Sequence, residues 1–127
     1  MKTVVKIATD LAPKALGPYS QATSGAGLVF VSGQLPLDMK GEMPSGIEDQ
    51  ARQSIKNLLG VLEGCGLTVH SILKTTVFLL DMNDFSAINS IYQETFGQTI
   101  PARSAIGVAG LPKGAKFEIE CIALETE

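Results

Sequence analysis

The sequence contains few of the residues on which metal and acid–base sites are usually built. It has one histidine, His70, and two cysteines. Neither Cys65 nor Cys121 belongs to a C-x-x-C pair or has a histidine at ligand spacing, so no metal site is expected. Both cysteines are expected to be free structural thiols, since unpaired cysteine behaves as a small hydrophobe. His70 has no second histidine to share acid and base roles, and we expect it in a surface turn.

Long apolar runs and clusters of basic residues are also missing. The sequence has no run of eighteen apolar residues and no basic leader with a hydrophobic segment. We therefore expect neither a membrane span nor a secretory signal, and a cytoplasmic location. Lys and Arg number 10 against 13 Asp and Glu, and the net charge of -3 argues against a general nucleic-acid binder. The 127 residues, 45% of them hydrophobic, predict one soluble globular domain over 1–127.

Hydrophobic periodicity predicts five strands and two helices. Strands are expected over residues 3–7, 28–32, 72–80, 102–109 and 116–124. One helix is expected to begin in the capping-box pattern of Ser45 and Glu48 and to end by Gly64, and the other to begin near Asn83 and Asp84. The last two strands flank the turn 110–114 and are expected to pair as a hairpin. This order predicts an α+β fold, with a mostly antiparallel, mixed sheet and both helices on one face.

Two of the predicted strands are apolar on both faces. The segments 28–31 and 77–80 carry apolar side chains at successive positions, which point to opposite sides of a strand. Two helices can cover only one face, and an exposed apolar sheet face is a liability. The simplest solution is a homo-oligomer in which symmetry-related copies pack sheet against sheet.

Arg103 begins a predicted strand on which its own face is otherwise small. With side chains alternating by two, it shares that face with Ala105, Gly107 and Ala109. A planar guanidinium matches a carboxylate bidentately, so this segment suggests a seat for a small carboxylic acid. A surface salt bridge is the alternative.

The final predicted strand carries two carboxylates. Glu118 and Glu120 share one face, and the apolar residues around them take the core face. If the hairpin register sets Ala105 opposite Glu120, Arg103 becomes its diagonal neighbour at roughly 7–8 Å between backbones. That gap would fit a three- or four-carbon acid, and a cross-strand ion pair is again the alternative.

Seven segments in the same order resemble the reactive intermediate deaminase family of the YjgF type over nearly the whole length. They are GPYSQA at 17–22, VSGQLP at 31–36, QARQS at 50–54, KTTVF at 74–78, NDF at 83–85, PARS at 101–104 and EIE at 118–120. The resemblance implies a chorismate-mutase-like fold that forms homotrimers with clefts between subunits. It also implies a site without metal or cofactor.

The resemblance further implies an activity and a set of site residues. Members of the deaminase branch hydrolyse enamines and imines, such as 2-aminoacrylate, 2-iminopropanoate and 2-iminobutanoate, to 2-oxo acids and ammonia. By this resemblance Arg103 anchors the substrate carboxylate and Glu120 positions or activates the attacking water. The pocket is expected to be lined, partly from the neighbouring subunit, by Tyr19, Ser32, Gly33 and Asn89.

The chain departs from the family pattern at two positions. Ala105 stands where many relatives carry cysteine, so thiol chemistry is excluded there, and Gly110 stands where an arginine or alanine often precedes the Leu-Pro turn. Judged without the resemblance, Tyr19 would be a core aromatic, Ser32 a residue that satisfies a strand end, and Asn89 a solvated helix residue.

Two other functions stay open at this point. A non-enzymatic regulator would use the same arginine to bind 2-oxo acids. An endoribonuclease that inhibits translation is the third possibility, and the acidic charge balance and lone His70 weigh against it.

Overall fold

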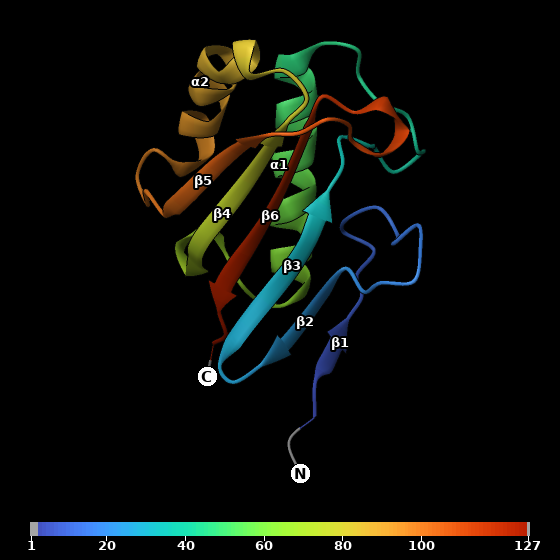
Figure 1. Ribbon diagram of the computed structural model, residues 1–127. Coiled ribbons are helices and arrows are strands. Elements are labelled where there is room, and N and C mark those ends of the chain that lie inside the picture. Colours follow the sequence, from blue (N-terminus) through green and yellow to red (C-terminus); the bar gives the residue numbers. More distant parts are fainter. Residues whose placement is uncertain (1–2, 127) are drawn as a thin grey trace.

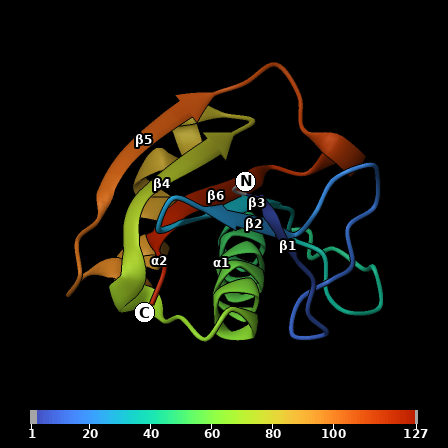
Figure 2. The same cartoon turned by 90° about the horizontal axis from the view of Figure 1, so that it is seen from below.

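The computed structural model describes residues 3–126, which form one six-stranded sheet and two long helices (Figure 1). The strands are β1 (Val5–Ile7), β2 (Ala22–Gly25), β3 (Leu28–Gln34), β4 (Ile72–Leu79), β5 (Ala102–Gly107) and β6 (Phe117–Leu124). The helices are α1 (Ile47–Gly64) and α2 (Phe85–Phe96), and short 3₁₀ turns cover Val69–Ser71, Met82–Asp84 and Pro112–Gly114. Figure 2 shows both helices on the same side of the curved sheet. The predicted α+β class is confirmed.

The sheet has the strand order β1-β2-β3-β6-β4-β5. Its pairings are antiparallel except for the parallel pair β4–β5. Helix α2 returns the chain to the end of the sheet where β4 began, so β5 runs parallel to β4 and takes its outer side. Strand β6 then pairs with β3 and β4 together. The predicted hairpin of the last two strands is therefore wrong, because β4 lies between them.

Strand β2 is missing from the sequence-based prediction. Its residues, ATSG, are small and have little preference for strands. The strand forms because a two-residue turn, Ala26–Gly27, reverses the chain and pairs Gly25 with Leu28. Both turn residues have positive φ, 54° and 79°, as a type I′ hairpin turn requires.

The helix starts differ in detail from the predicted caps. Gly46 is the N-cap residue of α1, so the capping box expected from Ser45 is displaced by one residue and does not form. Asp84 is the N-cap residue of α2 as expected, but its side chain makes no capping hydrogen bond. The carboxylate of Asp81 instead accepts a hydrogen bond from the Asn83 N–H at 2.9 Å, which caps the preceding 3₁₀ turn.

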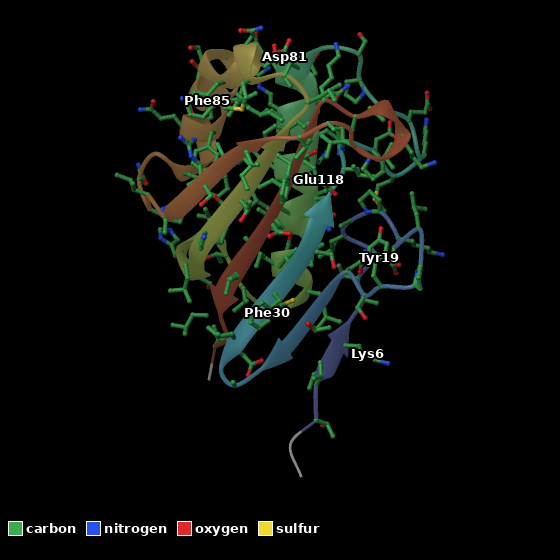
Figure 3. All side chains as sticks on the ribbon, in the orientation of Figure 1. Lys6, Tyr19, Phe30, Asp81, Phe85 and Glu118 are labelled. Atoms are coloured by element: carbon green, nitrogen blue, oxygen red, sulfur yellow. The ribbon has the colours of Figure 1, made fainter. Side chains whose placement is uncertain are left out.

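The core lies between the helices and one face of the sheet. Its fully buried members include Leu58, Leu62, Val77, Leu79, Ile88, Phe96, Phe117 and Ile119. The opposite face carries the apolar side chain of Phe30, which is 45% exposed (Figure 3). Ile106, which lies opposite Phe78 in the β4–β5 register, is on the same face and is 44% exposed. Neither helix in residues 3–126 combines the length and the hydrophobicity needed to cross a membrane.

Candidate functional site

Arg103 extends from β5 over helix α2. In the parallel pair it lies opposite Thr75, whose buried side chain marks this as the helix-covered face of the sheet. The guanidinium carbon lies 4.7 Å from the ring centroid of Tyr92 and 5.4 Å from that of Phe85. One guanidinium nitrogen, Nη1, donates a hydrogen bond to Asn89 Oδ1 at 2.8 Å. Within residues 3–126 no carboxylate lies within salt-bridge distance of Arg103, so the surface ion-pair alternative is wrong for this part of the chain.

Arg103 lines a cleft of about 600 Å³, which we call the arginine cleft. It is lined by Asn89, Tyr92, Gln93, Phe96, Gly97, Ile100, Pro101 and Arg103. Asn89 and Arg103, two of the predicted site residues, thus lie together in this cleft. Ile100 has a φ of 45°, a strained conformation for a β-branched residue, and such strain concentrates at binding sites.

A second cleft, of about 580 Å³, contains the carboxylates of β6, and we call it the carboxylate cleft. It is lined by Leu16, Tyr19, Ser32, Gly33, Leu35, Pro112, Lys113, Glu118 and Glu120. Four predicted site residues, Tyr19, Ser32, Gly33 and Glu120, come together here. Figure 3 shows Tyr19 on the N-terminal connector, with the end of β3 between it and Glu118.

A β-bulge shapes the floor of the carboxylate cleft. The register of β3 against β6 shifts between Val31 and Gln34, so Ser32 and Gly33 lie at the irregularity. A Cβ atom added to Gly33 would lie 2.5 Å from Glu118 Oε2. Glycine therefore lets the Glu118 carboxylate lie directly against the backbone of β3.

Hydrogen bonds hold the connector that carries Tyr19 beside β3. Ser32 Oγ donates to the Ser20 carbonyl at 2.6 Å, so Ser32 does satisfy a neighbouring backbone group while it lines the cleft. The Tyr19 hydroxyl accepts a hydrogen bond from the Leu16 N–H at 3.1 Å. Tyr19 is 49% exposed, so the alternative of a core aromatic is wrong.

The two carboxylates of this cleft have different surroundings. Burial, and then the negative charge of Glu120, raise the pKa of Glu118. A carboxyl group with a raised pKa can hold a proton and act as a proton donor. Glu118 is absent from the predicted site, although its position two residues before Glu120 on the same strand face was the signal available. Tyr92 and Phe85 were missed because their helical spacing is typical of core packing.

Within a single chain, Arg103 and Glu120 do not meet. On β4, Thr75 lies opposite Arg103 and Thr76 lies opposite Glu120. Successive strand residues point to opposite faces, so the guanidinium and the carboxylate lie on opposite sides of the sheet with β4 between their strands. The predicted diagonal contact is wrong, and within one chain the two residues line separate clefts.

The lone histidine and the cysteines lie where the sequence placed them. His70 is exposed in the 3₁₀ turn Val69–Ser71, and both cysteines are free. Burial raises the pKa of the Cys121 thiol to about 12. Within residues 3–126 no three His, Cys, Asp or Glu side chains are grouped as a metal site would require.

Comparison with known proteins places this geometry in a family. The family model described as Endoribonuclease L-PSP matches residues 9–125. The 2-iminobutanoate/2-iminopropanoate deaminase of Escherichia coli K12 is 47% identical over 122 residues, which cover 93% of this chain and 95% of that protein. The mouse (Mus musculus) protein of the same name is 43% identical over 129 residues, which cover 98% and 96%. The crystal structure of E. coli TdcF with bound serine has a TM-score of 0.91 and 44% identity, and the match covers 95% of this chain and 98% of that one.

Fold and sequence together define a small α+β protein of the kind that includes these deaminases and TdcF. The chain belongs to the Endoribonuclease L-PSP family, also called the YjgF or RidA family. The resemblance drawn from the seven sequence segments is thereby confirmed.

Proposed function

We propose that this protein hydrolyses small enamines and imines, such as 2-aminoacrylate, 2-iminopropanoate and 2-iminobutanoate, to 2-oxo acids and ammonia. The observation that carries the proposal is the Arg103 guanidinium, whose hydrogen-bond partner within residues 3–126 is the neutral Asn89. A cation so placed keeps its charge for a substrate carboxylate. Relatives at 47% and 43% identity are named for this reaction, and TdcF was solved with an amino acid bound. We place the activity in the cytoplasm.

The complete site in this proposal is shared between copies in a homotrimer. Arg103 and Glu120 lie on opposite faces of one sheet, so a substrate that meets both must lie between two chains. The uncovered face with Phe30 and Ile106 provides apolar area for packing between copies. In a closed ring, the arginine cleft of each copy would meet the carboxylate cleft of the next.

The chemistry needs few protein groups. An enamine first takes up a proton at its terminal carbon and becomes the iminium ion, which is the protonated imine and has an electrophilic carbon. Arg103 orients the substrate carboxylate, and Glu120 accepts a proton as water adds to the imine carbon. The nitrogen is then protonated, the carbon–nitrogen bond breaks to release ammonia, and the added hydroxyl group loses its proton to form the carbonyl of the 2-oxo acid. Glu118, whose pKa is raised, lines the same cleft as Glu120 and could donate or accept protons in these steps.

A coupled assay tests the proposal. An amino-acid oxidase or a threonine dehydratase generates the imine, and formation of the 2-oxo acid is timed with and without the protein. Arg103→Ala should weaken binding of 2-oxobutanoate by roughly 30- to 5,000-fold, the equivalent of about 2–5 kcal/mol for one partner of a desolvated charge pair. Arg52→Ala is the matched control, because Arg52 pairs with Asp49 and Glu94 on the helices and should leave binding unchanged.

The same assay separates the proposed enzyme from a regulator. A protein that only binds 2-oxo acids would show the calorimetric signal and its loss in Arg103→Ala, but would leave imine hydrolysis at the uncatalysed rate. Wild-type protein that neither binds 2-oxobutanoate nor accelerates hydrolysis would contradict both functions.

Ribonuclease activity is a second candidate, favoured by the description of the matching family model. The net charge of -3 opposes it, because RNA binding depends on neutralising phosphates. Incubation with labelled single-stranded RNA decides. Cleavage that is lost in Glu120→Gln would support this candidate, and intact RNA with a working imine assay would exclude it.

A further inference from the structure

Three side chains on one stripe of α2 hold the Arg103 guanidinium. Phe85, Asn89 and Tyr92 are spaced i, i+4 and i+7, so they face the same direction along the helix. The two rings contact the guanidinium at 5.4 and 4.7 Å, and Asn89 accepts its hydrogen bond at 2.8 Å. An arginine at a strand surface, which otherwise samples many rotamers, thus has three contacts from a single helix.

We propose that Tyr92 is a positioning residue that fixes the Arg103 guanidinium for carboxylate binding, and that buried Thr75 in turn fixes Tyr92. This inference rests on the proposed function, in which Arg103 binds the substrate carboxylate. Tyr92 shares the lining of the arginine cleft with Arg103.

The contact between Tyr92 and Thr75 ties the helix to the strand beside Arg103. The two hydroxyl oxygens are 2.7 Å apart, within hydrogen-bond distance. Thr75 is fully buried on β4 and lies opposite Arg103 in the β4–β5 register. The ring is therefore fixed from β4 at the same level at which Arg103 leaves β5. Thr75 contacts Tyr92 and Tyr92 contacts Arg103, so these contacts connect the adjacent strands β4 and β5 through helix α2.

A neutral aromatic clamp suits an arginine that must bind an anion. A cation over a ring is attracted to its face without being neutralised, so the guanidinium keeps its charge and most of its N–H donors for a ligand. A carboxylate clamp would instead compete with the substrate. Burial raises the pKa of Tyr92, so the phenol stays uncharged beside the bound anion. Because Arg103 is already ordered, binding also loses less side-chain entropy.

Three variants and one control test this role. Tyr92→Leu removes the ring, Tyr92→Phe removes only the hydroxyl, and Thr75→Val removes the partner of that hydroxyl while keeping its shape. Ile88→Val is the matched control, since Ile88 is fully buried on the same helix and lies outside the arginine cleft. For each protein, the Kd for 2-oxobutanoate, the KM and kcat of imine hydrolysis and the unfolding temperature are measured.

We expect the substitutions to change KM much more than kcat. In Tyr92→Leu, Kd and KM should rise by about 3- to 30-fold, the range of a partly desolvated cation–π contact, while kcat changes less than about threefold. Tyr92→Phe should recover most of the binding because it restores the ring, and Thr75→Val should lie between Tyr92→Phe and Tyr92→Leu. Ile88→Val should lower the unfolding temperature and leave Kd and KM unchanged.

A second readout is independent of any substrate. Nitrogen-15 relaxation of the Arg103 side chain, assigned by its absence in Arg103→Lys, reports how well the guanidinium is ordered. We expect faster motion in Tyr92→Leu than in wild type or Ile88→Val. If Tyr92→Leu does not fold, Tyr92→Met fills a similar volume without a ring face and replaces it.

The outcomes separate this inference from the proposed function. Wild-type binding and turnover with unchanged Kd, KM and Arg103 motion in Tyr92→Leu overturn the positioning role and leave the proposed function intact. Ordered Arg103 in wild type, mobile Arg103 in Tyr92→Leu and no binding or turnover in either protein support the clamp but contradict the proposed function.

Discussion

Mixing two inactive variants tests whether the site is shared between copies. Arg103→Ala removes the guanidinium of the arginine cleft, and Glu120→Gln removes the carboxylate of the carboxylate cleft. Each variant alone should be nearly inactive, the first through weaker substrate binding and the second through a turnover lower by about 10²–10⁴-fold. Both should fold, because neither side chain belongs to the buried core.

The way in which the arginine cleft of one copy meets the carboxylate cleft of the next determines the activity of the mixed trimers. In a mixed trimer, a shared cleft is intact when Arg103 comes from a Glu120→Gln chain and Glu120 comes from an Arg103→Ala chain. In a cyclic trimer that contains both chains, one of the three clefts pairs them in this order, so about one third of the clefts should be intact. We therefore expect roughly one third of wild-type turnover in the imine assay, against about 1% or less for each variant alone.

The two variants are co-expressed with different tags and purified in sequence, so that every particle contains both chains. Native mass spectrometry establishes the ratio of the chains, and the imine assay measures turnover per cleft. The control is a mixture of the two separately assembled variants, which should show only the sum of their residual activities. Mixed particles that are no more active than this control would refute a shared site, and with it the assignment of Arg103 and Glu120 to one reaction.

Three further predictions follow from single contacts. Gly33→Ala should change the unfolding temperature little but lower turnover about tenfold or more, because the added methyl group would displace the flexible end of the Glu118 side chain. Unchanged turnover would show that the position of Glu118 does not matter for the reaction. Because the pKa of Glu118 is raised in the folded protein, its contribution to stability is present below the unfolded pKa and is lost as pH rises through the folded pKa. Glu118→Gln stays neutral, so its unfolding temperature minus that of wild type should increase from pH 4 to pH 8 in calorimetry. A difference that stays constant with pH would contradict this. Cys121, with a pKa of about 12, should react with a thiol reagent at pH 8 roughly a thousandfold more slowly than an ordinary thiol and after Cys65, as followed by peptide mass spectrometry.

Alternation along the strands and helical periodicity were sufficient to predict most elements and which side chains face the core. Phe117, Ile119 and Cys121 are buried, as their spacing indicated, while Glu118 and Glu120 share the other face. The type I′ turn at Ala26–Gly27 was not recognisable, because Ala-Gly lacks the asparagine or aspartate that usually precedes glycine in such turns.

Strand order could not be predicted, because it depends on contacts far apart in sequence. The hairpin prediction for the last two strands used only their short separation, whereas β6 pairs with β3, with Leu28 opposite Leu124. That one error placed Arg103 and Glu120 on the same face. The family resemblance identified both residues correctly as cleft residues, since each lines a cleft, but only the register of β4 shows that they lie on opposite sides.

The central position of β6 also constrains how the chain folds. Strands β1, β2 and β3 form one half of the sheet and β4 and β5 the other, and only β6 hydrogen-bonds to both halves. Until β6 has been synthesised, β3 and β4 each present an unpaired edge, the kind of edge that recruits other chains into aggregates. Closure of the sheet therefore waits for a pairing of high contact order, which slows folding. A substitution that weakens β6 should thus reduce the yield of folded protein during synthesis more than its effect on the finished molecule would suggest.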